Sequence, residues 1–214
     1  MFKNIILATT LAIVAAAPVY AAPITSLYST GVDNSGVATT GNGADLHWTL
    51  ADGTAYTGGT NGSYPIGPWL SETSTSRWLT STPNAADVVG SPFVYSTTFS
   101  LAGFDPTTAS ISGRFAGDNG VTAILLNGTS ISTGADGFTA FTAFNYSGTA
   151  FSATTNTLEF DLRNDGGQAG LRVEVAGTAD QSVSVPEPAS LGLLAASVGL
   201  VGVIRRRRTT SASV

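Results

Sequence analysis

Few residues in this chain have the chemistry of a catalyst. The 214 residues include one His, His47, and no Cys, which excludes thiol nucleophiles, disulfides and zinc sites built from Cys. A catalytic His needs a nucleophile and an orienting carboxylate, and no such pair is recognisable beside His47. The chain also lacks a Gly-x-Ser-x-Gly elbow. We therefore predict that the protein is not an enzyme.

Paired carboxylates are the remaining candidates for acid–base chemistry. Glu159 and Asp161 alternate within one segment, so both point to the same face if that segment is a strand. A glycosidase holds its two carboxyl groups across a cleft, with one of them desolvated. A pair on a flat strand lacks that cleft. A solvated sheet face is the better interpretation, and glycan hydrolysis is a distant alternative.

Loops rich in Asp, Asn and Gly carry the oxygen ligands that calcium prefers. From two such loops, Asp118, Asn119 and Asp165 are the candidate metal ligands. The same residue types are also common in tight turns, because they tolerate a positive φ. The sequence leaves open whether calcium is a cofactor or the protein has none.

The segment from Tyr56 to Trp78 combines aromatic rings with many Gly, Asn, Ser and Thr residues. Sugars present apolar ring faces and polar rims, so a site that binds them needs both kinds of side chain. Trp69, Arg77 and Trp78 are the candidate ligand-binding residues. The alternative is that each tryptophan packs in the core, because Trp is largely buried on average.

Alternation of apolar and polar residues dominates the middle of the chain. This period of two is typical of antiparallel strands with one buried and one solvated face. It occurs at Phe93–Leu101, Ser110–Phe115, Leu158–Arg163 and Leu171–Val175, and further strands are expected at Leu46–Leu50, Arg77–Leu79, Val121–Leu126 and Phe138–Tyr146. About eight short strands predict an all-β fold, an antiparallel β-sandwich or jelly roll.

Clusters of Gly, Asn and Asp separate these segments. Asn127-Gly128 is a turn pair, and Asp118-Asn119-Gly120 is expected to lie between two strands. We also expect a hairpin that pairs Phe160 with Val173, which would place Asp161 opposite Arg172 as a favourable exposed ion pair.

The N-terminus has the composition of a secretory signal. Lys3 precedes an apolar run from Ile5 to Ala17, and small residues follow up to Ala21. This pattern predicts a signal peptide over residues 1–21 that signal peptidase cleaves after Ala21.

The C-terminus has the composition of a short membrane segment. Residues 189–204 contain no charge, and four arginines follow directly: Arg205, Arg206, Arg207 and Arg208. Such a segment spans a bilayer only marginally. The arginines stay cytoplasmic, so residues 22–185 are expected outside the inner membrane.

The order of parts in this tail resembles the PEP-CTERM sorting signal of exported bacterial proteins. The motif residues are Val185, Pro186, Glu187 and Pro188, followed by the apolar helix and the Arg cluster. The resemblance covers residues 185–208 and leaves a tail at 209–214. It implies a Gram-negative host that makes extracellular polysaccharide, and an exosortase that cuts near the motif. The body would then be released or transferred to the cell surface.

The body itself resembles the core of galactose-binding-like jelly rolls in exported bacterial proteins. The segments that carry this likeness are 109–116, 118–121, 126–128, 156–160 and 170–174. The likeness covers roughly Phe93–Thr178, within a β-sandwich domain expected over residues 22–184. The resemblance implies a lectin-like or adhesive module and assigns no binding residue.

Without its two terminal signals the protein is strongly acidic. Residues 22–185 hold 4 Arg, no Lys and 13 acidic side chains, a formal charge of −9, which disfavours nucleic acid as a partner. We therefore expect an exported, surface-sorted, non-catalytic protein associated with extracellular polysaccharide or a biofilm matrix. A carbohydrate-binding lectin, with or without calcium, is the alternative.

Overall fold

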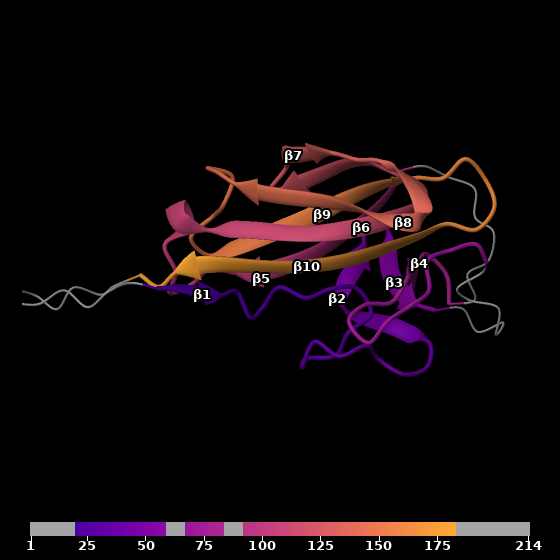
Figure 1. Ribbon diagram of the computed structural model, residues 1–214, viewed down its shortest axis with the longest axis horizontal. Helices are drawn as coiled ribbons and strands as arrows, with labels where there is room; N and C mark the ends of the chain where they lie inside the picture. Colours follow the sequence, from indigo (N-terminus) through magenta and orange to yellow (C-terminus); the bar gives the residue numbers. More distant parts are fainter. Residues whose placement is uncertain (1–19, 59–66, 84–91, 183–214) are drawn as a thin grey trace, which may run out of the picture. The chain divides into compact units, whose positions relative to one another are not determined.

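The computed structural model describes residues 20–58, 67–83 and 92–182 (Figure 1). The chain divides into two compact units, Met1–Gln181 and Ser182–Val214. Most of the predicted signal peptide, the sorting motif, the apolar segment and the Arg cluster lie outside the described residues. Within the described ranges, no helix is long and apolar enough to cross a membrane.

The described residues form strands joined by turns, with one short 3-10 helix, η1 (Pro106–Thr108). The strands are β1 (Ala21–Pro23), β2 (Gly43–Leu50), β3 (Gly53–Thr57), β4 (Leu79–Thr80), β5 (Phe93–Ser100), β6 (Ser110–Leu126), β7 (Thr129–Thr133), β8 (Asp136–Ser147), β9 (Thr155–Arg163) and β10 (Gly170–Asp180). Every pairing between them is antiparallel. The predicted all-β jelly-roll class is confirmed.

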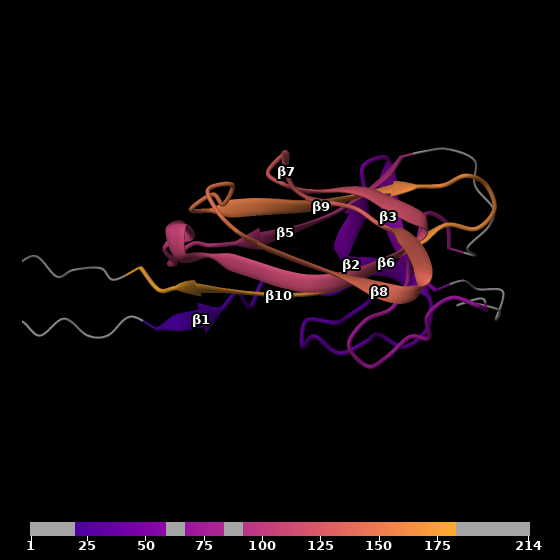
Figure 2. The same cartoon turned by 45° about the horizontal axis from the view of Figure 1, so that its top comes forward.

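The pairings of β6 divide the strands into two layers. Its first half lies between β8 and β10, and β1 pairs with the far side of β10. Its second half lies between β7 and β9, and that layer continues through β5, β2, β3 and β4. One further pair, Leu79 with Leu171, joins β4 to β10 and closes the ring of strands. Figure 2 shows β1 and the end of β10 at one end, with β2 and β3 toward the other.

The chain passes from one layer to the other within β6. We expected a turn at Asp118-Asn119-Gly120 between two strands, but β6 is one continuous strand of 17 residues that changes partners there. Glycine allows this close crossing. A Cβ at Gly117 would lie 2.7 Å from Cδ1 of Leu162, and one at Gly120 would overlap the carboxylate of Asp136.

The core fills the space between the layers and follows the predicted alternation. On β5 the buried side chains are Tyr95, Thr97 and Phe99; on β9 they are Asn156, Leu158, Phe160 and Leu162. On the opposite layer, Ile111, Phe115 and Val173 point into the same cluster. The turn prediction at Asn127-Gly128 is also confirmed, since both residues have a positive φ between β6 and β7.

The expected hairpin between β9 and β10 is wrong. Phe160 pairs with Tyr95 on β5 and with Ile124 on β6, whereas Val173 pairs with Phe115 on β6. Phe160 and Val173 do face one core, but from opposite layers. Alternation fixes which face of a strand is buried and does not identify the neighbouring strand, so the Asp161–Arg172 pair does not form.

Candidate functional site

The two tryptophans proposed as sugar platforms are buried. Trp69 is 6% exposed and Trp78 is 0% exposed, and their ring centroids lie 4.5 Å apart. They pack with Ala116 in a small second cluster, on the face of β6 opposite the core. Each indole N–H donates within the protein: Trp69 to Oδ2 of Asp118 and Trp78 to the Leu70 carbonyl, both at 2.8 Å. Neither ring presents a free face, so both have packing roles, the alternative interpretation of the sequence.

Arg77 is held by its own loop and by the loop before β2. Its Nε lies 3.0 Å from Oε2 of Glu72, whose other oxygen accepts the backbone N–H of Trp78 at 2.9 Å. Nη1 donates to the carbonyls of Thr39 and Gly41. The guanidinium therefore joins two loops, and its hydrogen bonds are already used within the protein.

Arg172 is a residue whose environment the sequence did not reveal. It was expected on an exposed strand face, yet it is 0% exposed, because the loop after Trp69 covers β10. Nε donates to Oγ of Ser76 at 2.7 Å, Nη2 donates to Oγ1 of Thr73 at 2.9 Å, and Nη1 donates to the Ser71 carbonyl. Burial lowers the pKa of Arg172, and the nearby Glu174 opposes that shift.

Glu174 and Phe141 complete this cluster. Glu174 accepts from Oγ of Ser76 at 2.8 Å and from Nε of Arg114 at 2.7 Å. Burial raises its pKa, but these hydrogen bonds outweigh that effect and leave the pKa below its usual value. The Phe141 ring contacts both guanidinium groups, 4.4 Å from Arg114 and 4.9 Å from Arg172. Together these contacts fasten the loop 69–78 to the outer surface of β6, β8 and β10.

The three candidate metal ligands have partners within the protein. Asp118 accepts the Trp69 indole N–H, Asp165 pairs with Arg163 at 3.0 Å, and Oδ1 of Asn119 accepts the Asp165 backbone N–H at 2.7 Å. Burial raises the pKa of Asp118, and the Trp69 hydrogen bond opposes this. Among the described residues, no group of three or more acidic or His side chains is arranged to hold a metal ion.

The described residues around His47 form no catalytic arrangement. Its ring stacks on Tyr28 with centroids 3.7 Å apart, and the nearby Asp45 binds backbone N–H groups of Gly31, His47 and Trp48. Burial raises the pKa of Asp45, although these hydrogen bonds oppose the shift. This carboxylate thus organises the backbone before and within β2.

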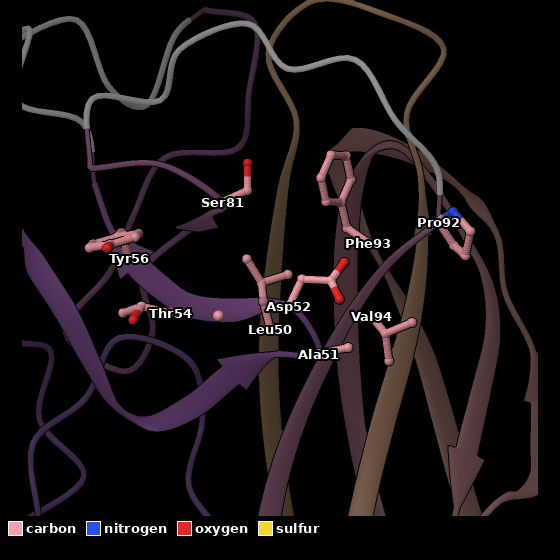
Figure 3. Close-up of a pocket in the computed structure, with 10 residues that line it drawn as sticks. Leu50, Ala51, Asp52, Thr54, Tyr56, Ser81, Pro92, Phe93 and Val94 are labelled. Carbon is pink, nitrogen blue, oxygen red and sulfur yellow. The ribbon is translucent and has the colours of Figure 1, made fainter.

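An open cleft of about 530 Å³ lies where the β2–β3 hairpin meets the start of β5 (Figure 3). Tyr56 and Phe93 stand on opposite sides of it, with Asp52 between them. The remaining lining comes from Leu50, Ala51, Gly53, Thr54, Ser81, Pro92 and Val94. The cleft combines apolar walls with hydroxyl and carboxylate groups, as a sugar site requires.

The polar side chains of this cleft have no partners in the described part of the protein. The hydroxyls of Thr54, Tyr56 and Ser81 and the carboxylate of Asp52 make no hydrogen bond or ion pair there. Thr54 and Tyr56 alternate with buried Ala55 on β3, so both face the cleft side of the hairpin. Within the described residues these groups therefore differ from those of Trp69 and Arg77, which already bind other parts of the protein.

The sequence analysis included Tyr56 in the aromatic segment but predicted the binding site at Trp69 and Trp78. Phe93 was expected only as a core residue. The sequence did offer one signal for this site: the Asp52-Gly53 turn places the Asp52 carboxylate close in sequence to the Tyr56 ring.

Comparison with known proteins identifies the C-terminal segment. Residues 184–208 match the PEP-CTERM protein-sorting motif. No curated protein matches the chain.

Two solved structures are similar to the chain, at low identity. One is the CBM36-1 domain of a multidomain xylanase from the hindgut metagenome of Trinervitermes trinervoides, at 11% identity and a TM-score of 0.32, covering 78% of this chain and 100% of that domain. The other is a carbohydrate-binding module CBM36 in complex with calcium and xylotriose, at 14% identity and a TM-score of 0.31, covering 52% of this chain and 94% of that module. The chain therefore carries a PEP-CTERM sorting motif that follows an all-β body in the sequence.

Proposed function

We propose that this protein is exported, sorted to the cell surface through its PEP-CTERM motif, and associated there with extracellular polysaccharide without catalysing a reaction. The match at residues 184–208 carries the proposal. In this account residues 1–21 are the signal peptide, 22–184 the functional body, 185–208 the sorting signal and 209–214 a tail.

The described ends of the body are compatible with processing at both termini. β1 pairs with the end of β10, with Ala21 opposite Asp180 and Ala22 opposite Ala179. Cleavage after Ala21 leaves Ala22 and Pro23 paired with β10, so β1 remains part of the sheet after the signal peptide is removed. The motif begins only a few residues after Asp180, so a cut near Pro186 leaves every strand intact.

The sorting step is tested by mass spectrometry of the protein from the cell envelope. The natural chain should lack its N-terminal 21 residues and its apolar tail. Replacing Glu187 and both flanking prolines with Ala should leave the tail attached and the protein in the membrane fraction. Glu159→Ala in the body is the matched control and should be processed normally. Recovery of the natural chain with residues 189–214 intact would refute the sorting proposal.

The cleft at the β2–β3 hairpin is the proposed contact with polysaccharide. Tyr56 and Phe93 offer apolar faces, and the unpaired hydroxyls of Thr54 and Ser81 offer hydrogen bonds. Its described lining holds one carboxylate, Asp52, whereas glycoside hydrolysis ordinarily needs two. The described part of this lining contains no Arg or Lys and the body is acidic, which favours a neutral polysaccharide over an anionic one.

Affinity electrophoresis through gels that contain a neutral polysaccharide from the producing cells tests this contact. Tyr56→Ala should weaken retention about tenfold, the equivalent of about 1.4 kcal/mol, because a stacking face is lost. Leu46→Ala removes another exposed apolar side chain, on β2, and should leave retention unchanged. Runs with and without calcium address the calcium-dependent alternative. Equal retention of the Tyr56 variant and the natural protein would reject the cleft as the contact.

A further inference from the structure

One edge of the layer that contains β10 is open along most of its length. In the order β8, β6, β10 and β1, the edge strands are β8 and β1. β1 has three residues and includes Pro23, which cannot donate a backbone hydrogen bond. β8 has twelve residues and pairs with β6 alone among the described strands.

The backbone of β8 that faces away from β6 is nearly free of partners. Leu70 donates its N–H to the Phe138 carbonyl at 2.8 Å, which covers the beginning of the strand. From Thr139 to Ser147, no described residue forms a backbone hydrogen bond on that side. Alternate N–H and C=O groups of an edge strand point outward, so this stretch is a template for another strand.

β8 also lacks two of the features that usually protect an edge. From Gly137 to Ser147 it contains no charged residue and no proline, and it is rich in Phe, Thr and Tyr, which favour strands. Its pairing with β6 is regular from Thr142 to Ser147, and the register shift within the strand lies before this stretch, between Gly137 and Thr142. Exposed edges in soluble proteins usually carry Lys, Pro or a bulge that prevents strand addition.

We propose that β8 is an assembly edge, at which two copies of this protein join by antiparallel pairing of β8 with β8. Self-pairing suits this edge for an electrostatic reason. The body carries a formal charge of −9, yet the uncharged stretch 137–147 brings no like charges together across the new strand pair. The outward side chains of Ala143 and Asn145 are small and exposed, so they leave room for a second sheet to continue the layer.

The position of the chain ends favours the same arrangement. Ala21 and Asp180 lie at the β1 side of the layer, the opposite edge from β8 (Figure 1). Pairing at β8 therefore leaves Ala21 and Asp180 unobstructed. Because a single strand pair buries less area than a stable interface, the association is weak and depends on concentration, as at a crowded cell surface.

Sedimentation velocity of the exported protein, purified from the envelope in detergent, tests the pairing from about 1 µM to about 500 µM. The natural protein should show concentration-dependent dimers. Ala143→Glu combined with Asn145→Glu places like charges on both paired strands and should raise the dimer dissociation constant at least about tenfold. The control, Ser112→Glu with Thr98→Glu, adds the same charge at exposed positions of β6 and β5 that do not face each other, on strands that each have neighbours on both sides, and should dimerise normally.

Hydrogen exchange of the natural protein supplies a second readout that needs no variant. Amides of β8 should gain protection as the concentration rises, while those of β1 and β7 should not change. Three results would overturn the proposal: a monomer over the whole range, equal dimerisation of the Ala143/Asn145 variant and its control, or new protection at another edge. None of these results bears on the sorting signal or the cleft.

Discussion

Replacement of Arg172 by Met tests whether the buried guanidinium fastens the loop 69–78 to the sheet. Met retains much of the apolar stem but removes the charge and all three donors. Arg172 is completely buried, so each lost donor leaves an acceptor in a site that water does not readily reach: the Ser71 carbonyl, Thr73 Oγ1 and Ser76 Oγ.

The expected cost follows from these contacts. Hydrogen bonds to a charged group contribute about 1.5 kcal/mol or more each, and the contact with Phe141 contributes about 1 kcal/mol. Against this, the variant no longer buries a charge, which recovers part of the desolvation cost. The two hydroxyls can also rotate toward Glu174, which already accepts from Ser76. We therefore expect a net loss of about 3 kcal/mol in the free energy of unfolding.

Urea unfolding followed by tryptophan fluorescence measures this loss, because Trp69 and Trp78 lie in and beside the fastened loop. The matched control is Arg163→Met, since Arg163 pairs with Asp136 and Asp165 on the surface with 38% of its side chain exposed. Surface pairs contribute less than about 1 kcal/mol. If Arg172→Met costs no more than Arg163→Met, the loop is held by its tryptophans and the reasoning from the buried guanidinium is refuted.

Three further substitutions give separate tests by the same unfolding assay. Tyr95→Phe should leave stability at neutral pH unchanged or raise it by about 1 kcal/mol, because the buried Tyr95 hydroxyl has no partner among the described residues. Burial raises the pKa of Tyr95 above its ordinary value of 10.0. The free energy of unfolding of the natural protein should therefore fall by about 1.4 kcal/mol per pH unit above pH 10 from this group alone. An equally steep decline in the Phe variant would contradict this. Asp118→Ala should cost about 1 to 2 kcal/mol by removing the carboxylate that accepts the Trp69 indole N–H; a neutral result would mean that another acceptor replaces it. Gly134→Ala should cost about 1 to 3 kcal/mol, because its Cβ would overlap the backbone of Val121; an unchanged midpoint would show that the loop before β8 can move aside.

The strands were predictable because their pattern is local. Alternation at Leu158–Arg163 identified a strand with one buried face, and Asn127-Gly128 identified a turn from the backbone freedom of those two residues alone. Strand partners were not predictable in the same way. Phe160 and Val173 satisfy the same pattern whether they are neighbours in one sheet or face each other across the core, and the structure has the second arrangement.

The burial of Arg172 could not be predicted from the sequence, because it depends on a segment that is distant in the chain. Its position in an alternating strand indicates only the face that points away from the core. That face is covered by the loop containing Ser71 and Ser76, about a hundred positions earlier in the chain. An arginine on an outward face has the same sequence pattern whether or not a loop covers it.

The site predicted from the sequence and the cleft found in the structure differ for a related reason. Aromatic composition correctly marked the stretch 56–78 as unusual, but composition does not distinguish a ring that packs from a ring that is free. The structure makes that distinction through hydrogen bonds: the indoles of Trp69 and Trp78 donate within the protein, whereas the Tyr56 hydroxyl has no partner among the residues that the structure describes. The cleft also needs Phe93 and Ser81, which come from separate segments that no local pattern connects.

The fastened loop determines which surfaces remain for function. By covering part of the outer face of β6, β8 and β10, it removes the aromatic cluster from contact with solvent. In the described part of the chain, the cleft at Tyr56 and the outer edge of β8 keep polar groups without partners. These two places share no residue with each other or with the paired chain ends at Ala21 and Asp180. A variant that blocks one proposed activity should therefore leave the other two intact. Loss of polysaccharide retention in the Ala143/Asn145 variant would show instead that retention depends on assembly through avidity, and that the cleft alone is too weak to hold the protein in the matrix.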